Sequence, residues 1–129
     1  MEDSRIFGCV YNGVLCWGDV KATRCTVENN GANGVSVIGA SCELVHCVIS
    51  KNGNSGVNAH ASKVMLRGGT ISENRRNGVN AVQGTKVTVA KAEEGKPQTI
   101  SKDNERHKWH TMDRGSEIIG SSQEKINRD

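Results

Sequence analysis

The stretch NGANGV at residues 30–35 recurs as NGNSGV at residues 52–57 and as NRRNGV at residues 74–79. An Asn, a short turn and a Gly-Val pair therefore return at nearly constant intervals along the chain. The Gly-Val pairs are 21, 22 and 22 residues apart, at Gly13-Val14, Gly34-Val35, Gly56-Val57 and Gly78-Val79. Self-similarity with a fixed period of about 20 to 50 residues is the sequence signature of a repeat architecture.

Columns of mostly apolar residues follow each Gly-Val pair with the same period. The first column holds Val20, Cys42, Val64 and Val87, and the next holds Ala22, Leu44, Leu66 and Val89. A third column holds Ile6, Val27, Ile49 and Ile71, and the likeness of QTISKDN (98–104) to GTISENR (69–75) extends it to Ile100. Apolar residues at alternate positions are typical of strands with one buried face, and no window before residue 105 is periodic enough for a helix.

Two β architectures contain repeated Asn-Gly corners. In an antiparallel meander, each Asn-Gly forms a two-residue hairpin, but a meander does not require the same residue class to return at a fixed period. A coil that climbs one strand spacing per turn does require it, because equivalent positions then stack about 4.8 Å apart. The sequence therefore favours an all-β parallel solenoid of about five coils with roughly 22 residues in each.

The Asn-x-x-Asn/Ser-Gly-Val corner and the Val and Ile columns resemble the right-handed parallel β-helix of the pectin-lyase-like superfamily over residues 4–119. That family includes sugar hydrolases and many carbohydrate-binding proteins, so the resemblance implies a fold and not one activity. Corner Asn residues in the family stack into ladders along the axis, a role that the resemblance implies for Asn30, Asn52, Asn74 and Asn104. We expect the corner Gly to take a turn conformation that other residues avoid, and the Val after it to begin an inward row.

The chain length of 129 residues fits a single domain. We expect the β-helix domain to span residues 1–120. Residues 91–98, KAEEGKPQ, contain the only proline and predict an insertion loop, and residues 121–129 predict a polar tail. Because residues 1–5 contain no amphipathic capping helix, we expect the chain to be part of a larger protein or to stack end to end with a copy of itself.

Composition argues against two classes of partner. Lys and Arg number 17 against 14 Asp and Glu, and the excess is spread along the chain, so no basic face is indicated. The aromatic residues are few, which leaves little to stack on nucleic-acid bases. No stretch approaches the roughly 18 apolar residues that span a membrane, and the N-terminal MEDSRIFG lacks the features of a signal peptide. The sequence therefore predicts no nucleic-acid or membrane partner, and it does not define a cellular compartment.

The cysteines and histidines do not form a recognisable metal or cofactor motif. Five cysteines without a CxxC pair argue against a disulfide framework or a zinc ribbon. Cys25 and Cys47 fall in one column, one coil apart, where two packed thiols are favoured over a disulfide. A metal site needs three or four convergent ligands, whereas His46, His107 and His110 are scattered and are expected to be solvated or to lie at corners. We therefore expect no metal and no cofactor.

Alternation assigns an outward side to the strands that follow the Gly-Val pairs. If the Val of each pair points inward, the next residues point outward, namely Leu15, Ser36, Asn58 and Asn80. The following outward column is Trp17, Ile38, His60, Val82 and, by alignment of residues 109–119 with 79–89, Met112. This largely apolar column, here called the stripe, would run for roughly 20 Å at about 4.8 Å per coil. We predict that it is a contact surface, unless another segment covers it or the phase of alternation is reversed.

The outward columns also bear on catalysis. The β-helix lyases and hydrolases that the chain resembles carry acids, calcium ligands and a catalytic Lys or Arg on outward strand positions, and glycoside hydrolysis uses two carboxylates about 5 to 9.5 Å apart. The candidate acid here is Asp19, with Lys21 and Glu43 near it and no second Asp stacked on it. No catalytic residue is therefore assigned.

We predict a non-catalytic β-helix module that binds a protein or a polysaccharide through its outward strand faces. Self-association through the stripe or end to end is a further expectation. The alternative is a divergent or truncated carbohydrate-active enzyme of the polysaccharide lyase or epimerase type. Stacked outward acids would favour the enzyme, whereas an exposed apolar column favours the binding module.

Overall fold

The computed structural model describes residues 1–90, 100–105, 109–111 and 115–120. Within these ranges every regular element is a β-strand, and the strands pair in parallel. The expected insertion loop 91–98, the expected tail 121–129 and Met112 lie outside the described residues. Among those that are described, no helix is long and apolar enough to cross a membrane.

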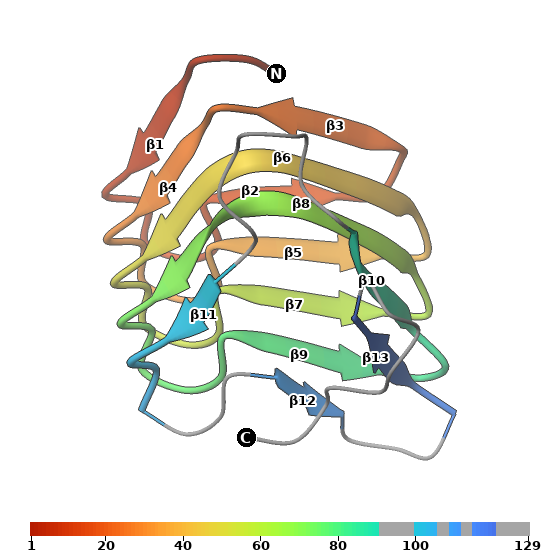
Figure 1. The fold of residues 1–129 in the computed structure, drawn as a ribbon. Coiled ribbons are helices and arrows are strands. Elements are labelled where there is room, and N and C mark those ends of the chain that lie inside the picture. Colours follow the sequence, from red (N-terminus) through yellow and green to blue (C-terminus); the bar gives the residue numbers. More distant parts are fainter. Residues whose placement is uncertain (91–99, 106–108, 112–114, 121–129) are drawn as a thin grey trace.

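The strands form three faces, which the chain visits in the same order in each turn (Figure 1). Face 1 is the sheet of β2 (Val14–Cys16), β5 (Val35–Ile38), β7 (Val57–His60), β9 (Val79–Val82) and β12 (Trp109–Thr111). Face 2 holds β3 (Val20–Thr23), the first halves of β6 (Ser41–Ser50) and β8 (Lys63–Ser72), β10 (Lys86–Ala90) and β13 (Glu117–Ile119). Face 3 holds β1 (Arg5–Phe7), β4 (Thr26–Glu28), the second halves of β6 and β8, and β11 (Ile100–Lys102). The long strands β6 and β8 thus continue across the bend between faces 2 and 3.

Equivalent residues of successive turns lie side by side in the register of the sheets. On face 1, Val57 pairs with Val35 on one side and with Val79 on the other. On face 3, Ile49 pairs with Ile71. The chain therefore makes a parallel solenoid with roughly 22 residues per turn, as the repeat predicts, and with about four turns where about five were expected.

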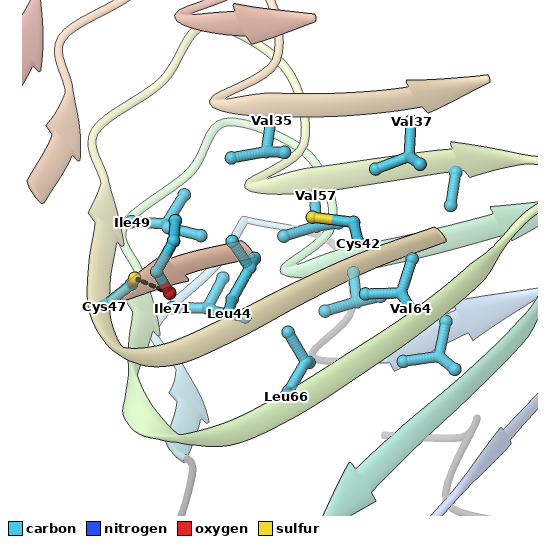
Figure 2. Close-up of a cluster of buried hydrophobic side chains, with 14 of the residues drawn as sticks. Val35, Val37, Cys42, Leu44, Cys47, Ile49, Val57, Val64, Leu66 and Ile71 are labelled. Carbon is cyan, nitrogen blue, oxygen red and sulfur yellow. Dashed lines mark hydrogen bonds between the residues drawn. The ribbon is translucent and has the colours of Figure 1, made fainter. Parts of the chain in front are cut away.

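The interior is built from the inward columns that alternation predicts, and side chains from the three faces meet there (Figure 2). Val57 on face 1 is fully buried, and Leu66 on face 2 and Ile49 on face 3 are 2% and 1% exposed. On the other side of the face-1 strands, Trp17 and Ile38 are 73% and 45% exposed. The predicted phase of alternation is therefore correct.

An asparagine ladder runs along the corner between faces 3 and 1. The Nδ2 atom of each Asn donates to the Oδ1 atom of the Asn one turn on, at 3.1 Å from Asn30 to Asn52, 2.9 Å from Asn52 to Asn74 and 2.9 Å from Asn74 to Asn104. Asn52 and Asn74 are fully buried, so these amides satisfy one another where water has no access. The ladder implied by the family resemblance is confirmed at all four residues.

The corner glycines are required for space and not, as expected, for their backbone conformation. Gly34 and Gly56 are not among the residues with positive φ. A Cβ atom on Gly34 would lie 2.7 Å from Nδ2 of Asn52 and 2.7 Å from Cγ2 of Ile49. The ladder amide and the inward Ile therefore fill the volume that a side chain would need.

The left-handed backbone conformation falls instead on the residue before each ladder Asn. Asn29, Lys51, Glu73 and Asp103 have φ values of 56°, 56°, 56° and 55°. Non-glycine residues adopt this conformation uncommonly, and its repetition in each turn shows that it is part of the corner design. It lets the chain leave face 3 and place the next Asn inward.

Strand β11, which follows residues 91–99, pairs with β8 in a register that differs by one residue from the expected one. Ile100 pairs with Thr70, and Ser101 pairs with Ile71. The assignment of Ile100 to the Ile49 and Ile71 column is therefore wrong, and Ser101 takes that place, 7% exposed. The cause is the ladder, because Asn104 accepts from Asn74 and so fixes the strand before it.

Candidate interaction surface

The stripe lies along one edge of face 1, on the outside of the solenoid. Ile38, His60 and Val82 are the last residues of β5, β7 and β9 and pair with one another across the sheet. Trp17 directly follows β2. Exposure falls along the stripe from Trp17 (73%) and Ile38 (45%) to His60 and Val82, which are half-buried.

The outward column beside the stripe, which begins at Leu15, changes from apolar to polar along the axis, so face 1 has an apolar end and a polar end. Leu15 is the middle residue of β2, two residues before Trp17, and is 52% exposed, so it enlarges the apolar part to Leu15, Trp17 and Ile38. Further along the axis the column turns polar, where Nδ2 of Asn80 donates to Oδ1 of Asn58 at 2.8 Å. Leu15 was predicted to point outward, but the polar residues that share its column hid its contribution to the exposed apolar part of face 1.

A second ladder, built of hydroxyl groups, holds the corner between faces 1 and 2. The backbone N–H of Ala40 donates to Ser62 Oγ at 3.3 Å, that of Ser62 to Thr85 Oγ1 at 3.1 Å, and that of Thr85 to Ser116 Oγ at 3.1 Å. Ser62, Thr85 and Ser116 are buried. This ladder fixes the corner directly after the stripe. The sequence analysis missed it because Ser and Thr alternate in the ladder and the number of residues between successive members is not constant.

A shallow hollow of about 580 Å³ lies on the outer side of face 2. A second hollow of about 480 Å³ covers the corner between faces 1 and 2, and both are lined by Asp19, Ser41, Lys63 and Lys86. The corner hollow also contacts Gly39, the residue after Ile38. The outward side of face 1, the corner and face 2 thus form one continuous outer surface.

The residues weighed for catalysis line the same hollow on face 2. Asp19, Lys21 and Glu43 all line it. One carboxylate oxygen of Asp19 accepts the backbone N–H of Ser41 at 3.0 Å, and Nζ of Lys21 lies 3.9 Å from Oε2 of Glu43. These contacts join neighbouring turns, so the acids have a structural role that does not depend on a substrate.

Among the described residues, the cysteines and histidines do not group into a metal site. Cys25 and Cys47 are buried free thiols, as predicted, and donate to backbone carbonyl oxygens. Within the described part of the chain, no three His, Cys, Asp or Glu side chains are grouped to hold a metal ion. His46 lies at the bend of β6 with positive φ, which is a corner position as expected, and its Nε2 atom is buried. His107 lies outside the described residues.

The repeated part of the chain matches a known protein family. Residues 4–93 match the family described as right handed beta helix region, which is more than half of the chain. No curated protein and no solved structure matches it. The parallel three-faced coil, the asparagine ladder and this match agree. The chain belongs to the right-handed β-helix family, within the pectin-lyase-like group of folds.

Proposed function

We propose that the chain is a non-catalytic β-helix module that binds a protein or glycan partner through the outward side of face 1. The observation that carries the proposal is the grouping of Leu15, Trp17 and Ile38, which are 52%, 73% and 45% exposed at one end of this face. Large apolar side chains that are exposed together usually mark a contact surface.

The fold supports binding because the backbone that carries these side chains is packed against the core before a partner arrives. Val37 and Cys16, the inward neighbours of Ile38 and Trp17, are 0% and 2% exposed, so the strands that carry the apolar residues are fixed from behind. A preorganised surface loses little conformational entropy on binding. Trp is also among the residues that contribute most to the free energy of association at protein interfaces.

A protein partner fits the apolar end of the face better than a glycan does. Leu15 and Ile38 offer only aliphatic surface, which is buried favourably against apolar side chains at about 25 cal/mol per Å². The amides of Asn58 and Asn80 already bond to each other at 2.8 Å, so part of their hydrogen-bonding capacity is used.

Substitution separates this proposal from a structural role for the same side chains. We expect the double variant Trp17→Ser, Ile38→Ser to retain the melting temperature of the wild type and to lose self-association in sedimentation or retention of a partner in a pull-down. The matched control is Val48→Ser on face 3, since Val48 is 40% exposed but lies away from face 1. Equal binding by the wild type and the double variant would contradict the proposal.

A second candidate, a divergent polysaccharide lyase or epimerase, is favoured by one observation. Asp19, Lys21 and Glu43 line a common hollow although they come from two different turns. The test is turnover of polygalacturonate or alginate by the wild-type chain and its loss in Asp19→Asn. Asn keeps an oxygen that accepts the Ser41 amide, so loss of turnover would report on the carboxylate and not on the corner.

A further inference from the structure

The Asn-Gly dipeptide that recurs at the corners is chemically labile. The backbone nitrogen of the residue after an Asn attacks the side-chain amide carbon in a flexible chain, and Gly, which has no side chain, hinders this attack least. The chain contains five Asn-Gly pairs, which begin at Asn12, Asn30, Asn33, Asn52 and Asn77. Two of them begin at residues of the asparagine ladder, Asn30 and Asn52. The binding surface proposed above uses neither.

The glycines that follow these two ladder residues are required for space. A Cβ atom on Gly31 would lie 1.9 Å from the carbonyl oxygen of Val10, and one on Gly53 would lie 2.2 Å from that of Gly31. The backbones of successive turns therefore approach too closely at these positions for a side chain. The ladder and this close approach together place the labile dipeptide at the corner.

The folded coil holds every group that the reaction would have to move at Asn52. Its Oδ1 atom accepts from Nδ2 and from the backbone nitrogen of Asn30 at 3.1 and 3.2 Å. Its Nδ2 atom donates to Oδ1 of Asn74 at 2.9 Å and to the carbonyl oxygen of Val27 at 3.4 Å. The attacking nitrogen, that of Gly53, donates to the carbonyl oxygen of Asn30 at 2.8 Å. Asn52 is also 0% exposed, so both its amide and water are kept from reaction.

Asn30 is held in a similar way. Its Oδ1 atom accepts the backbone N–H of Cys9 at 2.9 Å, and its Nδ2 atom donates to Asn52. The N–H of Gly31 donates to the carbonyl oxygen of Cys9 at 2.7 Å, and Asn30 is 3% exposed. The partners of both ladder residues lie in neighbouring turns, so the shielding lasts only as long as the coil is formed.

We propose that Asn30-Gly31 and Asn52-Gly53 are latent deamidation sites, which the coil keeps inert and which react when it unfolds. In the unfolded chain the Gly nitrogen bonds to Cγ of the Asn and loses its proton, and the side-chain nitrogen leaves as ammonia. One water molecule then opens the succinimide ring. Opening at the side-chain carbonyl gives aspartate, and opening at the backbone carbonyl gives isoaspartate.

Either product at residue 52 prevents the return of the ladder. An aspartate has no Nδ2 donor for Oδ1 of Asn74, and it brings a negative charge into a buried site. An isoaspartate adds one carbon atom to the backbone, which shifts the register of every residue after it. Deamidation at Asn52 therefore makes unfolding irreversible, because the chemically changed chain does not refold.

Asn74 is an internal control that the chain itself supplies. It belongs to the same ladder and is also 0% exposed, but Arg75 follows it in place of a Gly. The Arg side chain hinders the attack by its backbone nitrogen, so Asn74 should stay intact in the unfolded chain while Asn30 and Asn52 react. A difference between these residues thus reports on the dipeptide and not on burial.

The test compares the chain in native buffer and in guanidinium chloride at the same mildly alkaline pH, with peptide mapping by mass spectrometry. In denaturant, tryptic peptides 25–51 and 52–63 should gain about 1 Da per converted residue, with fragmentation spectra that include Asn30 and Asn52 among the sites. Peptide 68–75, which contains Asn74, should keep its mass. In native buffer, conversion at Asn30 and Asn52 should be at least about 100-fold slower, because few chains are unfolded. Equal rates in the two buffers, or conversion of Asn74 as fast as that of Asn52, would overturn the proposal.

Refolding measures the consequence for the ladder. After timed incubation in denaturant and dilution, the fraction that regains the native circular dichroism spectrum should fall in step with conversion at Asn52. A chain kept in denaturant at mildly acidic pH, where the attack is slow, is the matched control.

A direct substitution tests the aspartate product. Asn52→Asp should lower the equilibrium constant for folding by at least about tenfold. Asn54→Asp, half-buried on the same corner and outside the ladder, should change it by less than about threefold. Complete refolding of chains converted at Asn52, or equal effects of the two substitutions, would contradict the role of the ladder in making unfolding irreversible.

Discussion

The inward and outward sides of the face-1 strands change very differently from turn to turn. Inward, the first position is Val35, Val57 and Val79 in three successive turns, and all are 0–1% exposed. Outward, the corresponding stripe changes from Trp through Ile and His to Val at residues 17, 38, 60 and 82. The strands, their register and their spacing are the same on both sides, so backbone geometry does not cause this difference.

The difference shows which constraint acts on each side. An inward side chain is enclosed by neighbours above, below and across the solenoid, and only a narrow range of volumes fits. An outward side chain meets solvent or a partner, so its type follows from what the surface contacts. The interior therefore carries the information about the fold, whereas the outward side of face 1 is free to differ from turn to turn.

The largest expected effect is at the centre of the interior. Ile49→Ala should lower the free energy of unfolding by about 2 to 5 kcal/mol, because it leaves a cavity between Val27 and Ile71. Chemical denaturation measures the effect, with Ile49→Val as the graded control at about 0.5 to 1.5 kcal/mol. A loss below about 0.5 kcal/mol for the Ala variant would remove the contrast between the two sides.

A smaller effect is expected from the polar part of the interior. Asn52→Ala should destabilise by about 1 to 3 kcal/mol, because the Nδ2 of Asn30 loses its acceptor and the Oδ1 of Asn74 loses a donor in a buried environment. Asn54→Ala, on the same corner but half-buried and outside the ladder, is the matched control. Equal destabilisation by both variants in urea unfolding would mean that the corner, and not the ladder, supplies the stability.

The hydroxyl ladder should contribute less than the asparagine ladder. Thr85→Val keeps the shape of the side chain but removes the oxygen that accepts the Ser62 amide at 3.1 Å, and about 1 kcal/mol is expected. Thr88→Val, on the outward side of face 2, should change stability by less than about 0.5 kcal/mol. Thermal unfolding of both variants gives the comparison, and a neutral Thr85→Val would show that the corner does not depend on this bond.

The smallest effect is expected on the outward side. Ile38→Ser should change the free energy of unfolding by no more than about 0.5 kcal/mol, because Ile38 is 45% exposed. Val37→Ser, one residue earlier and fully buried, should cost several times more in the same denaturation experiment. Similar losses at the two positions would show that Ile38 is part of the core and would weaken the proposed binding surface.

Repetition decided which features could be predicted from the sequence. The strands, the inward columns and the Asn30 to Asn104 ladder were predicted because the same residue class returns each turn. The register at Ile100 was wrong because a local likeness, TIS, outweighed the ladder position of Asn104. The corner glycine was assigned to the correct place for the wrong reason, since the side chains that exclude a Cβ come from the next turn.

The candidate sites were predicted less completely, because they include contacts between residues of different columns. The outward position and exposure of Trp17 and Ile38 followed from alternation, whereas whether they bind a partner stays a prediction. Cys16 and Cys42 come from different faces and turns yet line one residual void, and a sequence aligned by its period places them in unrelated columns. Such neighbours are defined by the closing of the coil around its corner, which requires three-dimensional structure.

The asparagine ladder also gives the solenoid an electrical direction. The amide nitrogens of Asn30, Asn52 and Asn74 each donate to the Asn oxygen of the next turn, so the oxygens of Asn52, Asn74 and Asn104 face the preceding turn. The amide dipoles are therefore aligned head to tail, with a partial negative charge at the Asn30 oxygen, which accepts the N–H of Cys9 at 2.9 Å. Aligned hydrogen bonds polarise one another by roughly 10 to 30% per bond, so the loss of one amide weakens links that it does not touch. A substitution at one Asn of the ladder is therefore expected to weaken the hydrogen bonds between the other Asn residues as well.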